Sequence, residues 1–403
     1  MKVLQINAVY GHGSTGTIVR DLTHLCEEFG IDCYIASPDR NVLGASKGYL
    51  IGGKFDHKLH GFLYRLHGRQ AYFSKTATKR LLSFIHTIKP DVVHLHNLHS
   101  NFINLELLLD FLAKFNIRTI ITLHDCWFYT GGCYHYTADG CDGWLKKCEK
   151  CPQEKQDPIG FFWKKTAQNL ADRKRLFLSI PRLDVVGVSD WIANEAKRTF
   201  FRNSHVLTIH NGVDMTVFKP TKSDLRHRLG LDNKYVILGP ASKWLLPVNQ
   251  PVLEYFASNM KSDEVLLLFG ANNTEIEIPQ NIKLFGYTAK RDELAALYTC
   301  ADVFVNTSRE DSLSLINVES QACGTPVVTF DATGPKETVD GIISRSVEVG
   351  NAVELFKQVT AIRNTHFGDV RSKCRKFVEQ EFEIKSNYKK YIDLYKQGNQ
   401  CEE

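Results

Sequence analysis

Short apolar runs alternate with longer amphipathic stretches along almost the whole chain. Ten such runs stand out, at residues 2–9, 31–37, 90–97, 119–125, 182–189, 235–240, 265–270, 282–286, 303–307 and 325–330. Runs of this length with little polar alternation are typical of buried parallel strands. The stretches between them have the spacing of amphipathic helices. The pattern predicts two doubly wound α/β sheets, with 182–189 as the last strand of the first.

The position of the boundary follows from length and turn chemistry. A chain of 403 residues is too long for one ordinary core and fits two domains of about 200 residues. Residues 205–214 include Asn-Gly-Val-Asp, a turn-forming sequence. We therefore predict an amino-terminal domain at 1–207, a carboxyl-terminal domain at 208–380 and an amphipathic final helix within 381–403.

Composition narrows the class of protein. Hydrophobic residues make up 43% and charged residues 24%, as in ordinary globular proteins. The net charge of +5 permits an anionic ligand or membrane surface but is too small for a nucleic-acid partner to be expected. No run of about 20 apolar residues occurs. Because the amino terminus reads directly as a strand and not as a signal peptide, we expect a cytoplasmic protein.

Residues 54–89 form a basic segment with many aromatic side chains. Leu59, Phe62, Leu63 and Leu66 recur at helical spacing. A pair of helices packed on the core, with a solvated basic face, explains this pattern. A patch that rests on anionic lipid or accepts a lipid-phosphate substrate explains it as well.

Two carboxylates accompany a strand–loop–helix unit in the second half. Asp311 lies in the loop after the strand at 303–307, and Glu319 lies inside the helix that follows. Such a unit directs backbone N–H groups and the positive end of the helix dipole at an anion. Ionised carboxylates nearby suit sugar or ribose hydroxyls. An ordinary βαβ unit with two surface acids would read the same.

In the first half, histidines end two predicted strands. His94 and His96 share a face of one strand, and His124 with Asp125 ends another. Open α/β sheets bind ligands at this edge, although such histidines are often structural. A turn with glycines at 11, 13 and 16 follows the first strand and precedes a helix that we predict at residues 18–29. This turn suits phosphate or an ordinary βα connection.

A cysteine-rich segment at 126–152 follows His124. Four thiols, at Cys133, Cys141, Cys148 and Cys151, would complete a closed tetrahedral Zn²⁺ site. Only one true C-x-x-C is present, so disulfides and unbridged thiols stay open as alternatives. A reducing compartment favours the metal over disulfides. A nucleic-acid-binding zinc module would need a basic recognition helix that this segment lacks.

These motifs resemble the signature of retaining, GT-B-fold glycosyltransferases of the family 4 type. In that family a Glu, seven residues and a second Glu precede a tail like Ala-Cys-Gly-Thr-Pro-Val-Val, which stands at 322–328 here. A similar Cys-rich insert recurs in bacterial members that make surface polysaccharide. The resemblance covers nearly the whole chain. It implies an α/β GT-B fold, with two Rossmann-like doubly wound domains and an interdomain cleft.

The resemblance also implies roles for the candidate residues. Glu319 would hold the ribose of a nucleotide-sugar, while Asp311, with Glu310 beside it, and His124 would contact the donor sugar. Tyr287 lies where members cradle the base, although a core position is equally compatible. The donor diphosphate would be held by one cation and two loops: Lys243, Gly13, Gly16, Ser312, Leu313, Ser314 and Leu315.

One segment departs from the family pattern. After the strand at 235–240, members place an Arg and, five residues later, a Lys that neutralise the diphosphate. Here Lys243 stands at the Arg position and Val248 at the Lys position. A point charge thus replaces a bidentate fork, and one cation is lost. Arg309 is a candidate to compensate.

The function implied is retaining transfer of a hexose from a UDP- or GDP-sugar to a glycan or lipid-linked glycan. The setting would be bacterial surface polysaccharide synthesis, with possible peripheral contact at the inner membrane face. No cofactor is required for the chemistry, and zinc would be structural. The alternative is a catalytically impaired GT-B protein that acts as a nucleotide-sugar-binding or scaffolding subunit.

Overall fold

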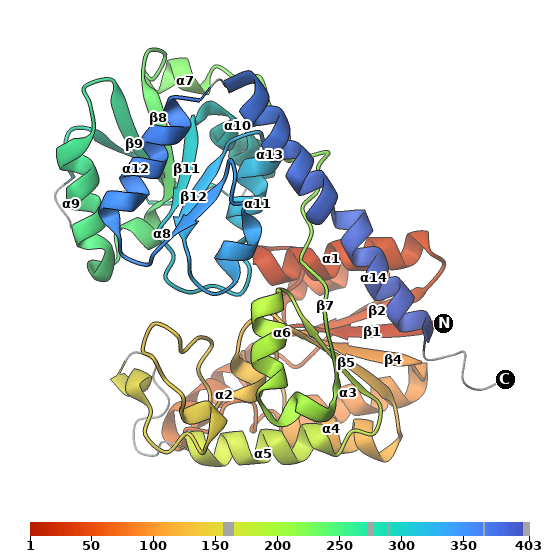
Figure 1. The fold of residues 1–403 in the computed structure, drawn as a ribbon. Helices are drawn as coiled ribbons and strands as arrows, with labels where there is room; N and C mark the ends of the chain where they lie inside the picture. Colours follow the sequence, from red (N-terminus) through yellow and green to blue (C-terminus); the bar gives the residue numbers. More distant parts are fainter. Residues whose placement is uncertain (156–164, 272–277, 289, 366, 398–403) are drawn as a thin grey trace. The chain divides into compact units, whose positions relative to one another are not determined.

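A computed structural model describes residues 1–155, 165–271, 278–288, 290–365 and 367–397. The chain forms two units, each built around one parallel sheet (Figure 1). Unit 1 contains Met1–His210 together with the chain from Tyr388 onward, and unit 2 contains Asn211–Asn387. The final segment predicted at 381–403 includes residues 398–403, which lie outside the described residues.

Unit 1 has a seven-stranded sheet in the order β3-β2-β1-β4-β5-β6-β7, and every pairing is parallel. Its strands are β1 Lys2–Ile6, β2 Asp32–Ser37, β3 Gly48–Leu50, β4 Val92–Leu95, β5 Arg118–Leu123, β6 Leu183–Gly187 and β7 His205–Thr208. The central strands are buried throughout, as expected for a sheet covered on both faces. Its helices are α1 Gly13–Glu28, α2 Lys54–His67, α3 Lys75–Ile88, α4 Leu105–Lys114, α5 Thr166–Leu178 and α6 Asp190–Lys197.

The prediction of the last strand in the first sheet was wrong. β7 pairs in parallel with β6, so the sheet continues beyond residues 182–189. β7 is four residues long and begins with the exposed His205, so it lacks the buried apolar run that marks a central strand. The three-residue edge strand β3 was missed for the same reason.

The carboxyl-terminal helix α14, Ile384–Gln397, is amphipathic as predicted. From Tyr388 onward it belongs to unit 1. Tyr391 and Tyr395 are buried there, and Tyr395 OH lies 2.7 Å from His94 Nδ1. Arg118 Nη1 donates to the Leu394 carbonyl over 2.7 Å. Helix α14 is therefore part of the core that surrounds β4 and β5.

Unit 2 has a six-stranded parallel sheet in the order β10-β9-β8-β11-β12-β13. Its strands are β8 Tyr235–Pro240, β9 Glu264–Phe269, β10 Ile282–Phe285, β11 Val303–Asn306, β12 Val327–Phe330 and β13 Arg345–Val347. The five strands predicted for this half are present, and the short edge strand β13 was missed. Its helices are α7 Leu225–Arg228, α8 Ala241–Trp244, α9 Gln250–Asn259, α10 Arg291–Cys300, α11 Leu315–Ala322, α12 Ala352–Arg363 and α13 Phe367–Glu381.

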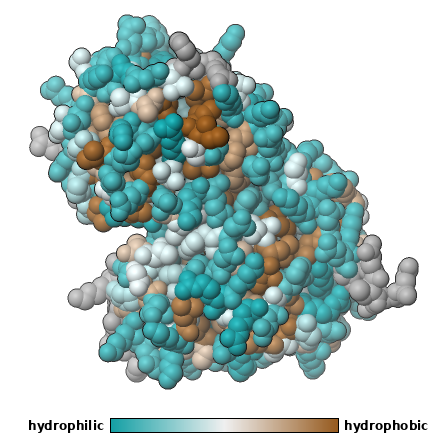
Figure 2. Space-filling model, viewed as in Figure 1, coloured by the Kyte–Doolittle hydropathy of each residue, from teal (hydrophilic) through white to brown (hydrophobic). Residues whose placement is uncertain are grey.

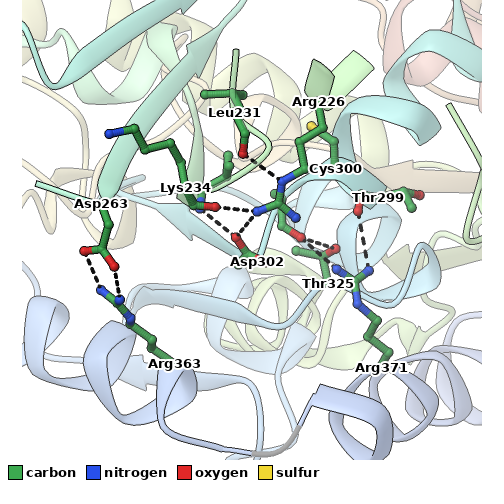
Figure 3. A network of polar contacts seen from close by, with 12 residues as sticks. Arg226, Leu231, Lys234, Asp263, Thr299, Cys300, Asp302, Thr325, Arg363 and Arg371 are labelled. Atoms are coloured by element: carbon green, nitrogen blue, oxygen red, sulfur yellow. Dashed lines mark hydrogen bonds and ion pairs between the residues drawn. The ribbon is translucent and has the colours of Figure 1, made fainter. Parts of the chain in front are cut away.

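Charged side chains are paired at the edge of this sheet where its strands begin (Figure 3). Asp302 accepts from the Val236 amide and from Arg226 Nη2, each over 2.7 Å. Arg363 forms ion pairs of 2.5 Å with Asp263 and Glu264. These contacts connect the starts of β8, β9 and β11 to the surrounding helices. The charged groups involved do not lie at the carboxyl-terminal ends of the strands, where the loops described below begin.

The face of the molecule in Figure 2 is mostly hydrophilic, and its hydrophobic residues form separate patches. Every helix among the described residues is too short or too polar to cross a bilayer.

Candidate functional site

The loop at residues 307–314 joins β11 to α11 and carries Asp311. The Asp311 amide donates to Thr333 Oγ1 over 3.0 Å, and that hydroxyl donates to the Asp311 carbonyl over 2.7 Å. Gly334 packs so closely that an added Cβ would lie 2.0 Å from the Ser312 carbonyl oxygen. Asp311 Oδ1 accepts from the Ser312 amide over 2.7 Å. The carboxylate is therefore half-buried and oriented by its own loop.

The amides that follow Asp311 differ in availability. The Ser312 amide is already bonded to Asp311, whereas those of Leu313, Ser314 and Leu315 have no acceptor among the described residues. Ser314 adopts a left-handed conformation, with φ of 69°, immediately before α11. Its hydroxyl accepts from Asn306 Nδ2 over 2.9 Å. A strained residue and free amides at a helix start are a plausible anion site.

Glu319 lies in the second turn of α11. Its Oε2 accepts from Tyr298 OH over 2.9 Å. Burial raises the pKa of Glu319 to about 7, although the Tyr298 hydrogen bond and the charge of Arg291 oppose this shift. The carboxyl group is therefore held at the border between its two protonation states near neutral pH, as is common for groups that act on ligands.

Two cations lie beside this loop in unit 2. Lys243, on α8, is half-buried and forms no ion pair among the described residues. Arg309 donates from Nη2 to the Val248 carbonyl over 3.0 Å and from Nε to Asn249 Oδ1 over 2.9 Å. The guanidinium thus lies against Val248, the position at which the family's second cation is absent. Arg309 Nη1 has no hydrogen-bond partner in the described part of the chain.

Two further predicted donor residues lie at the surface of unit 2. The side chain of Tyr287, just after β10, is 77% exposed, which excludes the alternative of a core aromatic. Glu310 is half-buried, and its carbonyl accepts from Ser308 Oγ over 3.0 Å.

In unit 1, three histidines and their partners form a chain of contacts from β4 to the end of β5. His124 Nε2 lies 3.0 Å from His96 Nδ1, and His96 Nε2 lies 3.1 Å from Gln5 Oε1. The rings of His94 and His96 are 4.0 Å apart, which confirms that they share one face. His94 Nε2 lies 2.8 Å from Thr122 Oγ1. His124 Nδ1 is buried without a hydrogen-bond partner among the described residues.

These histidines are held neutral. Burial lowers the pKa of His94 to about 3 and that of His124 to about 4, and it lowers the pKa of His96 as well. Asp125, next to His124, is also buried, which by itself raises the pKa of its carboxyl. His99, at 3.0 Å, and the Trp127 amide, at 2.8 Å, outweigh that effect and lower it. A neutral imidazole can exchange hydrogen bonds with hydroxyls without adding charge.

The Gly-rich turn after β1 is partly helical. We predicted a helix from residue 18, but α1 begins at Gly13, so Gly16 lies in its first turn. Gly13 has a φ of 61°, a left-handed conformation that favours glycine. An added Cβ at Gly16 would lie 3.2 Å from the Tyr10 amide nitrogen, so the tight packing of helix on turn requires glycine there.

The cysteine-rich segment folds as turns and short 3-10 helices. These are η2 Trp127–Tyr129, η3 Gly143–Leu145 and η4 Pro152–Lys155. Cys133, Cys141, Cys148 and Cys151 are half-buried, form no disulfide among the described residues and line one cavity. Burial raises the pKa of Cys133 to about 12 and that of Cys148 to about 11.

The basic aromatic segment forms two helices, α2 and α3, as predicted. α3 buries Leu81 and Ile85, whereas α2 buries only His60 among the residues described there. Three large apolar side chains of α2 are exposed: Phe55 by 77%, Leu59 by 46% and Phe62 by 64%. The interpretation that Leu59 and Phe62 pack on the core was therefore wrong.

Sequence reasoning missed the buried amides that hold the unit 2 loops. Asn249 donates from Nδ2 to the carbonyls of Lys243 and Thr307, each over 2.9 Å. Asn306 Nδ2 bonds Ser314 Oγ and Asn317 Oδ1, again over 2.9 Å. A polar residue at the end of an otherwise apolar strand, as at Asn306, was the available signal. Asn249 offered none.

Comparisons with known proteins agree with this arrangement. The profile of Glycosyltransferase Family 4 matches residues 15–217, half of the chain, and that of Glycosyl transferases group 1 matches residues 249–364. WcaC of Escherichia coli K12, named as a colanic acid biosynthesis glycosyl transferase, is 25% identical over 358 residues. The match covers 83% of this chain and 82% of WcaC.

Solved structures show the same fold at low identity. A glycosyltransferase from Rickettsia africae superposes with a TM-score of 0.69 at 16% identity and 98% coverage of both chains. HepE of Anabaena, solved in complex with UDP-glucose, gives 0.65 at 16% identity, with 98% and 99% coverage. The predicted GT-B fold is confirmed. Together with the profile match over half of its length, this shows that the chain is a member of Glycosyltransferase Family 4.

Proposed function

We propose that this glycosyltransferase moves a hexose from a UDP- or GDP-sugar to a glycan or lipid-linked glycan, with retention of anomeric configuration. The observation that carries the proposal lies in unit 2, in the segments that follow β8 and β11. These segments hold the free amides of Leu313–Leu315, the cations Lys243 and Arg309, and Glu319. This combination suits a nucleoside diphosphate, which needs cations for its phosphates and a carboxylate for its ribose hydroxyls. HepE, a protein of the same fold, was solved with UDP-glucose.

In this proposal Lys243, Arg309 and the Leu313–Leu315 amides bind the diphosphate. The bond between the anomeric carbon and the diphosphate oxygen breaks, and a bond from that carbon to the acceptor oxygen forms. The acceptor's hydroxyl proton passes to the departing nucleotide, so atoms and charge balance. Because negative charge grows on the diphosphate as it leaves, fixed cations and amides lower the barrier without a metal ion.

The remaining candidates would orient the sugar and the base. Glu319 would accept hydrogen bonds from the ribose, and Asp311, with Glu310 beside it, from the sugar. His124 would exchange a hydrogen bond through Nδ1, since its Nε2 is occupied by His96. Gly13 and Gly16 keep the turn before α1 free of side chains, and Tyr287 presents an exposed ring for the base.

Arg309 bears on the alternative of an inactive scaffold. The loss of a lysine at Val248 motivates that reading, yet the Arg309 guanidinium lies against the Val248 carbonyl. A second cation is therefore available at the position where the sequence lacks one. This contact favours the enzyme over the scaffolding subunit.

Titration calorimetry with UDP, GDP and ADP, together with a sugar-transfer assay, tests the proposal. One nucleotide should bind, and Glu319→Ala should weaken it about 10- to 100-fold, the effect of losing hydrogen bonds to a buried carboxylate. Arg363→Ala, at the opposite edge of the same sheet, is the control and should retain affinity. Binding without any transfer would favour the scaffold, and absence of binding would overturn the donor site.

We further propose that α2 binds the anionic inner face of the cytoplasmic membrane. A lipid-linked acceptor would be available at that surface. Phe55, Leu59 and Phe62 follow one helix face, and the exposed Lys54, Lys58 and Arg65 lie along its flank. Exposed apolar residues beside basic ones fit an interfacial helix. An open groove of about 430 Å³ near the end of α2 is lined by His67, Arg69, Tyr72, Phe73 and Lys165, which suits an anionic acceptor.

Vesicle sedimentation tests this membrane contact. The protein should bind phosphatidylglycerol vesicles and bind phosphatidylcholine vesicles much less. A Phe55→Ser, Phe62→Ser double variant should lose most of the binding. Leu178→Ser, which changes an exposed apolar residue on α5, should leave it intact. Equal binding to both lipids, or none to either, would contradict the assignment.

A further inference from the structure

Four thiols in unit 1 surround one small space. Cys133, Cys141, Cys148 and Cys151 line a cavity of about 20 Å³, together with backbone and side-chain atoms of the same loop. A volume of this order holds about one water-sized sphere. The four cysteines lie outside the helices and strands, so the fold of the loop brings them together.

The backbone around the thiols is shaped for close approach. Cys148 adopts a left-handed conformation, with φ of 50°, and its amide donates to the Gly143 carbonyl over 2.9 Å. An added Cβ at Gly131 would lie 3.0 Å from Cys148 Cβ and 2.7 Å from the Thr166 carbonyl oxygen. Thr166 Oγ1 donates to the Cys148 carbonyl over 2.5 Å. The loop is thus anchored to the start of α5, and glycine is required where it passes Cys148.

A buried cation next to the loop supplies an independent observation. Arg173, on α5, is fully buried and donates from Nη1 to the carbonyls of Trp127 and Thr130, over 2.7 and 2.5 Å. Its Nε and Nη2 are buried without partners, and no carboxylate pairs with it in the part of the chain that the structure describes. Burial lowers the pKa of Arg173 to about 10, and the negative forms of Tyr72, Cys133 and Cys148 oppose this shift. A buried guanidinium without a counter-ion is costly, which points to negative charge nearby.

We propose that Cys133, Cys141, Cys148 and Cys151 bind one structural Zn²⁺ ion as four thiolates. Four thiolates around Zn²⁺ carry a net charge of −2, which complements the unpaired charge of Arg173. On binding, four S–H protons are released to solvent and four Zn–S bonds form, with no change of oxidation state. The site has no open coordination position, so its role is to fix the loop that follows His124.

The four sulfur atoms must move closer together to coordinate the ion. Among the described residues no three of these sulfurs lie within 4.8 Å of one another, whereas sulfurs in a tetrahedral site lie about 4 Å apart. Metal-driven closure of this kind couples zinc binding to the folding of the loop.

Metal analysis of the reduced, desalted full-length protein tests the proposal. We expect about one zinc per chain, lowered several-fold in Cys141→Ser and Cys151→Ser. Cys300→Ser is the control: its thiol donates to the Leu297 carbonyl over 3.1 Å, a bond that serine can replace, and it should retain the zinc.

Cobalt substitution keeps the test valid if the serine variants do not fold. The wild-type chain loaded with Co²⁺ should show intense thiolate-to-cobalt charge-transfer absorption and the visible bands of a tetrahedral site. Zinc well below one equivalent without this absorption would overturn the proposal. So would alkylation and intact-mass measurement that finds disulfides among these cysteines in protein purified under reducing conditions. Neither outcome bears on sugar transfer.

Discussion

The two sheets have the same parallel topology, but their strand ends carry different chemistry. In unit 1, the ends of β4 and β5 hold His94, His96 and His124, which are in contact with one another and neutral. In unit 2, the segments that follow β8 and β11 hold Lys243 on α8, Arg309 in the loop before α11, and Glu319 on α11, whose pKa lies near neutral pH.

The difference follows from what each edge leaves unsatisfied. The unit 1 edge offers His124 Nδ1, which has no hydrogen-bond partner in the part of the chain that the structure describes and suits a neutral hydroxyl. The unit 2 edge offers cations and amides, which suit phosphates. One topology can therefore serve both halves of a transfer reaction, because function depends on the loops and not on the sheet.

The largest effect is expected from removing a cation at the unit 2 edge. Lys243→Ala should lower the turnover number about 10²- to 10³-fold, because the departing diphosphate loses a fixed charge in the transition state. Steady-state kinetics with the cognate donor measures this. Lys234→Ala, which removes a cation at the opposite edge of the sheet, should leave turnover unchanged. Similar losses in both variants would show that general charge, and not position, matters.

The neutral histidines should make the protein sensitive to acid. Their pKa values in the folded state lie below the ordinary 6.5, so the unfolded chain gains protons first as the pH falls. The contribution of each of these histidines to stability should be complete above pH 6.5 and should be smaller by about 3 kcal/mol at pH 4, since each pKa unit is about 1.4 kcal/mol.

Chemical denaturation at a series of pH values measures the slope of this loss. His96→Gln should flatten the slope, whatever its effect on absolute stability. His24→Gln, at a surface histidine whose side chain is 63% exposed, should not. An unchanged slope in His96→Gln would assign the acid sensitivity to carboxylates elsewhere.

Glu319 should lower the stability of the free protein at pH values above its pKa and strengthen nucleotide binding. Its folded pKa of about 7 lies above the ordinary 4.5, so its contribution to stability is present below pH 4.5 and is lost as the pH rises through 7. Glu319→Gln should therefore stabilise the free protein by about 1–3 kcal/mol at pH 8 and have little effect near pH 4. Thermal melts at both pH values, together with nucleotide titration, should show higher stability with weaker binding. A variant that loses both properties would make Glu319 a structural residue.

The smallest effect is expected at Tyr287. Tyr287→Ala should weaken nucleotide binding by about 1 kcal/mol, the contribution of one ring stacked on a base. Tyr287→Phe retains the ring and should bind as the wild type does. If both variants bind equally well, the exposed ring does not contact the base.

The sequence predicted long, buried elements best. β8 was placed at its observed bounds because it is a continuous apolar run between clear turn signals, and β12 was placed two residues too early at its start. β3, β7 and β13 were missed because edge strands of three or four residues bury too little to leave a pattern. The start of α1 was placed late because Gly13 and Gly16 read as loop, although packing at Gly16 requires glycine in the helix.

The sequence identified some features of the candidate site and not others, again according to whether they leave a local pattern. His124, Asp311 and Glu319 could be singled out because each ends or follows a recognisable strand. The contact between Arg309 and Val248 could not, because it joins residues 61 positions apart through a backbone carbonyl that any side chain would present. The network around Asn249 was invisible for the same reason, since long-range partners of a buried amide depend on the tertiary fold.

The chain leaves unit 1 after His210 and re-enters it at Tyr388, with consequences for biosynthesis. Unit 2 is one continuous stretch, so most of it can leave the ribosome before the segment from Tyr388 onward does. Unit 1 is completed later, because the contact between His94 and the hydroxyl of Tyr395 requires the segment from Tyr388 onward. On the ribosome, the half of the protein that is synthesised first is therefore the half that matures last.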